Sequence, residues 1–234
     1  MHAWRGWHWW PDADAFEVTV GAVLVQNTSW TNAERGVEAL RAAGVLKPDA
    51  MDALDLPRLE ALVRPSGQYR QKARKLKAFL DTCREAGGFA ALLQLPVAEL
   101  RRRLLATWGI GPETADAIIV YAARKPAFVI DAYTVRILGR LGMGPGPTAG
   151  YEAWQRYFVE RLPCDRDLWA RYHALLVMHA KHLWTKQVCR MRRPRSRHRA
   201  RLPGPRRCVA SLSVCWDQLA ATASSGHGGA YAAP

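Results

Sequence analysis

The residues whose spacing is best suited to chemistry are Gly109-Ile110-Gly111-Pro112, where two glycines and a proline interrupt an apolar helical pattern. Glycine permits a positive φ angle and close backbone approach, and proline fits the first position of a helix. Amides at the start of that second helix lack partners inside it and, with the helix dipole, can hold a phosphate oxygen. The glycines alone favour a simpler interpretation, a tight helix–helix turn. The whole pattern, with Thr114-Ala115-Asp116 following the glycines, favours the phosphate-binding interpretation instead.

The chain carries a large excess of positive charge. Its 234 residues have a formal net charge of +14, and the segment from Gln187 onward contributes +8 of it. Such a balance suits a polyanionic partner such as nucleic acid. Solubility alone, or a nonspecifically adhesive tail, would produce the same numbers, so charge leaves these interpretations open.

Helical spacing of apolar residues recurs through most of the chain. The predicted helices cover 15–43 (broken near Asn27-Thr28-Ser29, with Thr28 or Ser29 as a cap), 49–63, 71–86, 97–107, 112–123, 132–141, 151–162 and 167–186. Only 127–130 has an extended pattern, and four residues do not make a sheet. The sequence therefore predicts an all-α fold.

The two ends of the chain differ from this helical body. Residues 1–11 contain Trp4, Trp7, Trp9 and Trp10 without any regular period. Residues 190–207 contain nine arginines, three prolines and no acidic residue, which predicts disorder in the tail 187–234. A divergent tail and a shifted reading frame would both produce this abrupt change.

Four ordered motifs carry a resemblance to a known family. They are the hairpin segment 105–118, the segment 129–136 with Asp131 at a helix start, the helix 20–28 with Gln26, and the G-x-x-x-x-K-A segment at 67–73. Together they resemble the helix–hairpin–helix DNA glycosylases of the endonuclease III superfamily, over about 170 residues from Phe16 to Lys186. Within that superfamily, Trp9-Trp10-Pro11 and Trp30 resemble the branch that removes alkylated purines.

The resemblance implies a two-lobed helix–hairpin–helix fold with a DNA-binding cleft between the lobes. One lobe is expected at 19–124, ending in the hairpin, and the other is expected to join 1–18 to 125–186. Asp131 is then expected at the mouth of the cleft. The basic helix 71–86, with Lys72, Arg74, Lys75 and Lys77, would either add phosphate contacts or form a solvated face.

Asp131 is the catalytic residue that the resemblance implies. Cleavage of an N-glycosidic bond places positive charge on the sugar, and a carboxylate beside C1′ can stabilise that charge and orient or deprotonate water. The simpler interpretation is that Asp131 caps the helix that begins at Ala132. Both roles are compatible in one side chain.

The hairpin departs from the family pattern at Glu113. Family members that also cut the DNA backbone carry a lysine at this place, whose amine forms a Schiff base with C1′. Glutamate cannot do so, and the sequence therefore predicts a monofunctional glycosylase that uses water. A lysine from elsewhere in the chain would restore lyase activity. The DNA backbone is expected to contact Gly109, Ile110, Gly111, Glu113 and Thr114.

The target base must leave the duplex before its glycosidic bond becomes accessible. Trp9, Trp10 and Trp30 are expected to form its stacking pocket, because aromatic faces attract cations and 3-methyladenine is a cationic base in DNA. The alternative is that these tryptophans fill a core or an interface. Gln26 is expected to occupy the gap that the flipped base leaves, unless it is an ordinary polar helix end.

No metal or other cofactor is expected. Many family members hold a [4Fe–4S] cluster with four cysteines spaced C-x6-C-x2-C-x5-C. Here Trp184 stands near the first expected position, Cys189, Cys208 and Cys215 follow, and C-x-x-C is absent. Cys83 and Cys164 are expected to be buried thiols, and His173, His179 and His182 to be structural or to face DNA.

These features predict a base excision repair glycosylase that hydrolyses the bond to an alkylated purine in double-stranded DNA. The alternatives are an endonuclease III-like glycosylase and lyase acting on oxidised pyrimidines, and a non-catalytic DNA-binding module. No segment reaches the roughly 20 apolar residues of a membrane span, and residues 1–5 lack an apolar signal core. We therefore expect a cytoplasmic monomer that does not contact membranes.

Overall fold

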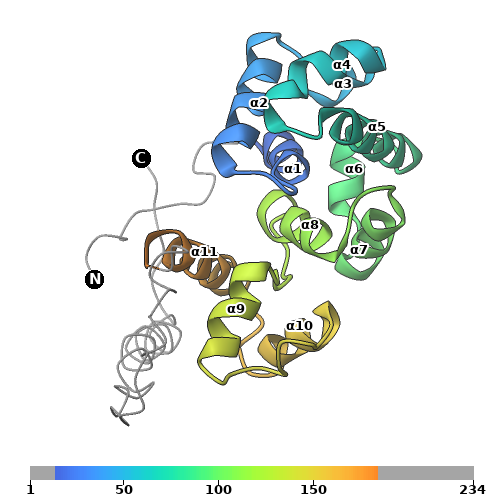
Figure 1. Cartoon of the computed structure of the whole chain (residues 1–234). Coiled ribbons are helices and arrows are strands. Elements are labelled where there is room, and N and C mark those ends of the chain that lie inside the picture. Colours follow the sequence, from blue (N-terminus) through green and yellow to red (C-terminus); the bar gives the residue numbers. More distant parts are fainter. Residues whose placement is uncertain (1–13, 184–234) are drawn as a thin grey trace, which may run out of the picture.

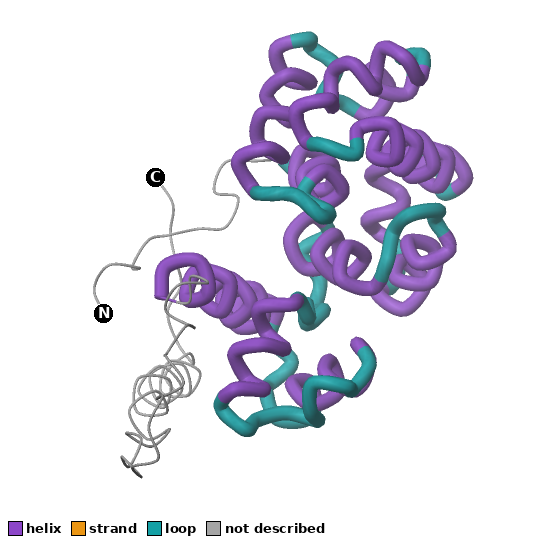
Figure 2. The backbone as a smooth tube through the Cα atoms, in the orientation of Figure 1, coloured by secondary structure: helices purple, strands orange, loops and turns teal. Residues whose placement is uncertain are grey.

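The computed structural model describes residues 14–183, and all regular elements in this range are helical (Figure 2). The α-helices, in chain order, are α1 (Ala15–Leu24), α2 (Trp30–Ala42), α3 (Pro48–Asp52), α4 (Leu56–Val63), α5 (Tyr69–Glu85), α6 (Phe89–Gln94), α7 (Val97–Ala106), α8 (Pro112–Ala117), α9 (Ala132–Arg140), α10 (Tyr151–Val159) and α11 (Arg166–Leu183). A 3₁₀ turn, η2 (Arg64–Ser66), follows α4, and a π-helical turn, η3 (Ile118–Ala122), follows α8. The all-α prediction is confirmed.

Local residues determine where several helices begin, and some of these starts were expected from the sequence. Ser29, one of the two predicted caps, accepts a hydrogen bond from the Asn32 amide at 3.3 Å and begins α2. Pro112 occupies the first turn of α8, as the sequence predicts. The predicted helix 49–63 is instead divided into α3 and α4, because Asp55 caps a new helix at Leu56. Helix α6 was not predicted.

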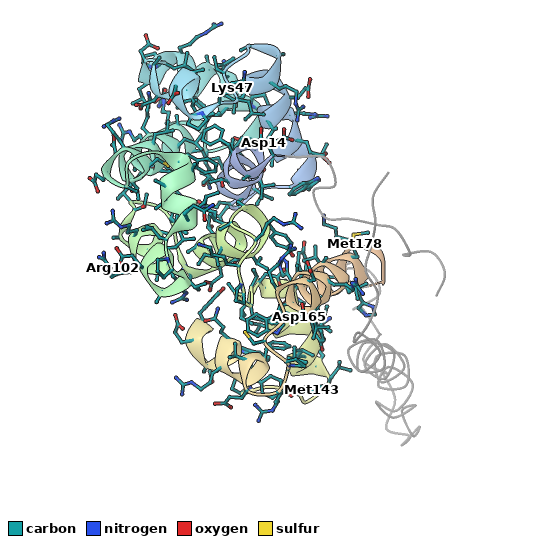
Figure 3. The ribbon with its side chains drawn as sticks, turned by 180° about the vertical axis from the view of Figure 1, so that it is seen from behind. Asp14, Lys47, Arg102, Met143, Asp165 and Met178 are labelled. Atoms are coloured by element: carbon teal, nitrogen blue, oxygen red, sulfur yellow. The ribbon has the colours of Figure 1, made fainter. Side chains whose placement is uncertain are left out.

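The apolar side chains form two separate clusters. The first gathers buried residues from α1 to η3, such as Val20, Leu59 and Leu100. The second is built from α9, α10 and α11 around Trp154, Phe158 and Trp169. In Figure 1 helix α8 lies between the two groups of helices, and in Figure 3 Lys47 and Met143 mark their opposite ends. The chain has the two-lobed helix–hairpin–helix fold.

The extended segment 127–130 joins the two lobes. Ala127 and Val129 pack in the first cluster, whereas Phe128 and Ile130 pack in the second. Successive side chains of an extended strand point to opposite sides, so four residues can serve two cores. This segment needs no sheet partner to be ordered, and it leads directly to Asp131.

Two details differ from the sequence-based expectations. Phe16, which the predicted boundary at 18/19 places with the second lobe, packs in the first cluster with the rest of α1. Cys83 is buried as expected, but Cys164 is exposed, because it lies in the loop before α11. Between residues 14 and 183, no helix is both long enough and apolar enough to cross a membrane.

Candidate active site

The hairpin between α7 and α8 has the backbone that its glycines predict. Gly109 has a φ angle of +83°, in the left-handed region, and the Ile110 amide donates to the Thr107 carbonyl at 3.1 Å. Ile110 itself is buried in the first cluster and anchors the turn. A Cβ atom on Gly109 would lie 2.4 Å from Cγ of Lys75. Glycine is therefore required here both by conformation and by the close approach of α5.

Gln26, at the turn after α1, holds the hairpin from the other side. Its Nε2 donates to Thr114 Oγ1 at 2.9 Å and to the Gly109 carbonyl at 3.3 Å. Its Oε1 accepts a hydrogen bond from the Lys75 ammonium. Partial desolvation lowers the pKa of Lys75. The structure thus places the predicted gap-filling glutamine against the hairpin, in contact with both of its ends.

Asp131 caps helix α9, as one of the two sequence interpretations states, and it is also buried. Its Oδ1 accepts the Thr134 amide at 2.7 Å, and its Oδ2 lies 3.7 Å from Nε2 of His173. Burial by itself would raise its pKa, but the interaction with His173 and the Thr134 hydrogen bond lower the pKa below the usual value. The carboxylate therefore remains charged at neutral pH although only 8% of the residue is exposed.

A tyrosine orients the histidine that faces Asp131. The Tyr121 hydroxyl lies 2.7 Å from Nδ1 of His173 and donates to the Ala170 carbonyl at 3.1 Å. Tyr121 belongs to η3, whose wider π-helical turn follows the hairpin helix; such turns are often found at functional sites. Asp165, just before α11, caps the start of this helix, to which His173 and Met178 belong; Figure 3 labels Asp165 and Met178.

Glu113, in the first turn of α8, is the second carboxyl group of the site. Its side chain is exposed to solvent, yet neighbouring protein atoms partly desolvate it, and this desolvation raises its pKa. The negative charge of Asp131 raises the pKa further, while His173 opposes the shift. The site thus pairs an ionised carboxylate with a carboxyl group that takes up a proton more readily than an ordinary glutamate.

The predicted aromatic pocket falls only partly within the described structure. Trp30 is half-buried at the start of α2, outside both apolar clusters, and its Nε1 donates to Glu34 at 2.6 Å. The Lys181 ammonium lies 5.7 Å from the centre of its ring. Trp30 therefore already holds a cation over one face, within the geometry of a cation–π contact. Trp9 and Trp10 lie outside the described residues.

Two of the basic side chains on α5 have structural roles. Lys72 was expected at a solvated or phosphate-contacting face, but it is only 1% exposed and its ammonium donates to the Ser66 carbonyl at 2.6 Å. Lys77 donates to the Asp52 carbonyl at 2.7 Å. Each lysine donates to the carbonyl of the last residue of a helical element, Ser66 of η2 or Asp52 of α3. The expectation that Lys72 is solvated or contacts phosphate was therefore wrong.

The described residues include no group of three or more histidine, cysteine or acidic side chains placed to hold a metal. Cys83 is packed in the first cluster, and burial raises the pKa of its thiol to about 12, far from the thiolate that a cluster needs. Cys189, Cys208 and Cys215 lie outside the described residues. The absence of an iron–sulfur cluster remains a prediction from cysteine spacing.

His173, which faces Asp131, and Tyr121, which contacts His173, were not predicted as neighbours of Asp131. His173 is far from Asp131 along the chain, Tyr121 precedes Asp131 by ten positions, and neither belongs to a recognisable motif. A signal was present, because His173 is a polar residue on the apolar side of a long helix and only 7% exposed. A buried histidine requires a polar partner, and Asp131 and Tyr121 are that partner set.

This chain is similar to known DNA repair proteins. The model of the family described as HhH-GPD superfamily base excision DNA repair protein matches residues 20–163. A protein of Methanocaldococcus jannaschii, named as a candidate DNA repair glycosylase, is 38% identical over 184 residues, or 77% of this chain and 83% of the relative. Endonuclease III of Sulfolobus acidocaldarius is 27% identical over 183 residues, or 77% of each chain.

Solved structures show the same fold. The 3-methyladenine DNA glycosylase of H. pylori, bound to 1,N6-ethenoadenine, has a TM-score of 0.66 at 29% identity and covers 74% of this chain and 87% of its own. A non-covalent endonuclease III–DNA complex has a TM-score of 0.64 at 20% identity, covering 77% of this chain and 80% of its own. The chain therefore belongs to the HhH-GPD superfamily of base excision DNA repair proteins.

Proposed function

We propose that this DNA glycosylase is monofunctional and removes alkylated purines from double-stranded DNA. One observation carries the proposal. Glu113 stands where the lyase-active relatives place a lysine, and its carboxyl group lies close enough to Asp131 for the two charges to interact. Position 113 therefore supplies no amine for a Schiff base, and two acidic side chains, Glu113 and Asp131, lie close together instead.

The chemistry follows from the states of the two carboxyl groups. Asp131 remains ionised and stabilises the positive charge that develops on the sugar as the glycosidic bond breaks. It also orients a water molecule for attack on C1′ and accepts the proton of that water. The hairpin amides of Gly109, Gly111, Glu113 and Thr114 hold a backbone phosphate of the same strand, independent of base sequence.

A pair of carboxyl groups favours a cationic base over a neutral one. An alkylated purine such as 3-methyladenine carries its positive charge until the bond breaks, and it then leaves as a neutral base without an added proton. Glu113 and Asp131 attract that cation, whereas a lysine would repel it. The 29% identical relative that binds ethenoadenine supports a purine pocket in this chain as well.

The test uses the full chain and three duplexes that carry 3-methyladenine, thymine glycol or no lesion. We expect release of 3-methyladenine, with strand breaks that appear only after alkali treatment. Release of thymine glycol without 3-methyladenine release would refute the proposed substrate class. No release from any duplex, with intact DNA binding, would indicate the non-catalytic module.

Endonuclease III-like lyase activity is the second candidate, favoured by the 27% identical archaeal relative of that name. Borohydride reduces a Schiff base to a stable protein–DNA adduct. A trapped adduct would show that a lysine elsewhere in the chain reaches C1′. The variant Glu113→Lys restores an amine at the family position and serves as the positive control for trapping.

A further inference from the structure

A buried carboxylate on the hairpin helix lies outside the chemistry described above. Asp116 of α8 is fully buried, yet both of its oxygens are engaged by hydrogen-bond donors. Arg101 of α7 donates from Nε to Oδ1 at 2.8 Å and from Nη2 to Oδ2 at 3.2 Å. A carboxylate and a forked guanidinium in this arrangement form a strong, directional pair.

Two further donors reach Asp116 from the other lobe. The Tyr151 hydroxyl donates to Oδ2 at 2.9 Å, and Gln155 Nε2 donates to the same oxygen at 2.7 Å; both residues belong to α10. Burial and the charge of Asp116 raise the pKa of Tyr151, so its hydroxyl keeps the proton that it donates. Asp116 is thus a bridge between the hairpin helix and the second lobe.

The same two side chains hold the segment that leads to the catalytic residue. Gln155 Nε2 also donates to the Phe128 carbonyl at 2.8 Å, and the Ile130 amide donates to the Tyr151 hydroxyl at 3.3 Å. Ile130 directly precedes Asp131. The path from Asp116 to Asp131 therefore consists of two hydrogen bonds and one peptide unit.

A fully buried carboxylate is costly unless its neighbours compensate for the lost water. Apolar residues could pack α8 against α10 at a lower free-energy cost of burial, but apolar contacts do not fix the position of a backbone amide. Hydrogen bonds from one acceptor to donors in two lobes fix both distance and direction. The arrangement is suited to setting the position of 128–131 relative to the hairpin, where the phosphate is expected.

We propose that Asp116 is a positioning residue for Asp131: through Tyr151 and Gln155 it sets the catalytic carboxylate relative to the phosphate-binding hairpin. This inference rests on the proposed function of Asp131. It assigns to Asp116, Tyr151 and Gln155 an effect on the rate of base release, with no contact to the base or the sugar.

The experiment uses Tyr151→Phe, which removes the hydroxyl between Asp116 and Ile130 but leaves the Arg101 pair intact. Asp116→Asn is the stronger variant, and Tyr151→Phe keeps the test valid if the former fails to fold. The matched control is Asp52→Asn, which removes a carboxylate that Arg84 Nη2 contacts at 3.2 and 3.0 Å within the first lobe. Each protein is compared in melting temperature, in affinity for a duplex with a stable abasic analogue, and in single-turnover release of 3-methyladenine.

A small displacement of a catalytic group costs about ten- to a hundredfold in rate. We expect Tyr151→Phe to lower the release rate by about tenfold while affinity changes less than about twofold. In an Asp131→Asn background the same substitution should have no further effect on the residual rate, because it acts through Asp131. Asp52→Asn should match the wild type. An unchanged rate in Tyr151→Phe, a parallel loss of rate and affinity, or an equal effect in the Asp131→Asn background would overturn the inference.

Amide hydrogen exchange separates this inference from the proposed function. If the wild type releases no base, the proposed function fails, but the positioning of 128–131 is still measurable. Tyr151→Phe should then speed exchange at the Ile130 and Thr134 amides, and Asp52→Asn should not. Equal exchange at both amides in the wild type and in Tyr151→Phe would refute the positioning role in either case.

Discussion

Replacement of Asp131 by asparagine removes the negative charge of this side chain, and with it the charge interaction with His173. Asparagine caps helices as well as aspartate does, so the bond from the Thr134 amide to Oδ1 and the start of α9 are retained. The volume of the side chain is nearly unchanged. The variant therefore tests whether the charge of the carboxylate, and not its capping role, supports base release.

The size of the effect follows from Coulomb's law. The carboxylate is 8% exposed, so the water that would screen it is mostly excluded. For a unit positive charge on the sugar at about 4 Å and an effective dielectric constant of about 20, the attraction is about 4 kcal/mol. At 1.36 kcal/mol per factor of ten, its loss lowers the rate by about a thousandfold.

The assay is single-turnover release of 3-methyladenine from a duplex, with affinity for a stable abasic analogue and thermal unfolding measured on the same samples. Asp131→Asn should lose about three orders of magnitude in rate with a nearly unchanged melting temperature. Asp131→Ala should also lose the cap and about 1 kcal/mol of stability. A rate for Asp131→Asn within tenfold of the wild type would refute the electrostatic role and leave only the cap.

Three further predictions concern residues around the site. Because the pKa of Glu113 is raised, the rate of release of a cationic base should begin to fall at a higher pH than the pKa of an ordinary glutamate predicts. Glu113→Gln should abolish that step in the pH–rate profile and lower the rate at the plateau about tenfold. Gly109→Ala should weaken DNA binding and destabilise the fold by more than the roughly 1–2 kcal/mol of left-handed strain, because Lys75 must also move; Gly44→Ala, with a φ angle of +71° and no atom within 4 Å, measures the strain alone. Lys72→Met should cost about 1–3 kcal/mol at pH 7 by leaving a carbonyl without its donor. Since the pKa of Lys72 is lowered to about 8, the wild type should gain stability relative to Lys72→Met between pH 8 and 10.5, measured as the difference in urea midpoints.

The features that could be predicted from the sequence were those that depend on neighbouring residues in the chain. Ser29 and Pro112 marked helix starts correctly because capping and the missing proline amide act within one turn. The hairpin conformation followed from Gly109 for the same reason. Residues whose role depends on distant neighbours were not visible. Lys72 reads as one of several basic residues on a helix, and only the packing of the η2 turn against α5 shows that it is buried.

The candidate site was predictable only as far as its motifs reach. Asp131 and the hairpin lie in segments with recognisable spacing. Asp116 also lies in such a segment, between Ala115 and Ala117 of α8, but nothing local distinguishes a buried carboxylate from a solvated one. Its donors come from α7 and α10, and the α10 donors are more than 30 positions away in sequence. Hydrogen bonds between residues so far apart leave no repeating pattern in the amino-acid sequence, so they cannot be predicted from it.

The electrostatics of the site and the two-lobed architecture depend on each other. Asp131 stays charged because His173 of α11 and the α9 amide compensate for its burial, and both helices belong to the second lobe. Glu113 belongs to the hairpin, and its pKa rises first because neighbouring atoms desolvate it and further because the lobes bring it close to Asp131. A shift of one lobe against the other would therefore change the charge of the site as well as its shape. The pKa of Glu113, measured by NMR, should be lower in Asp131→Asn than in the wild type, because the variant lacks the negative charge of Asp131. An unchanged pKa would show that the two carboxyl groups do not interact.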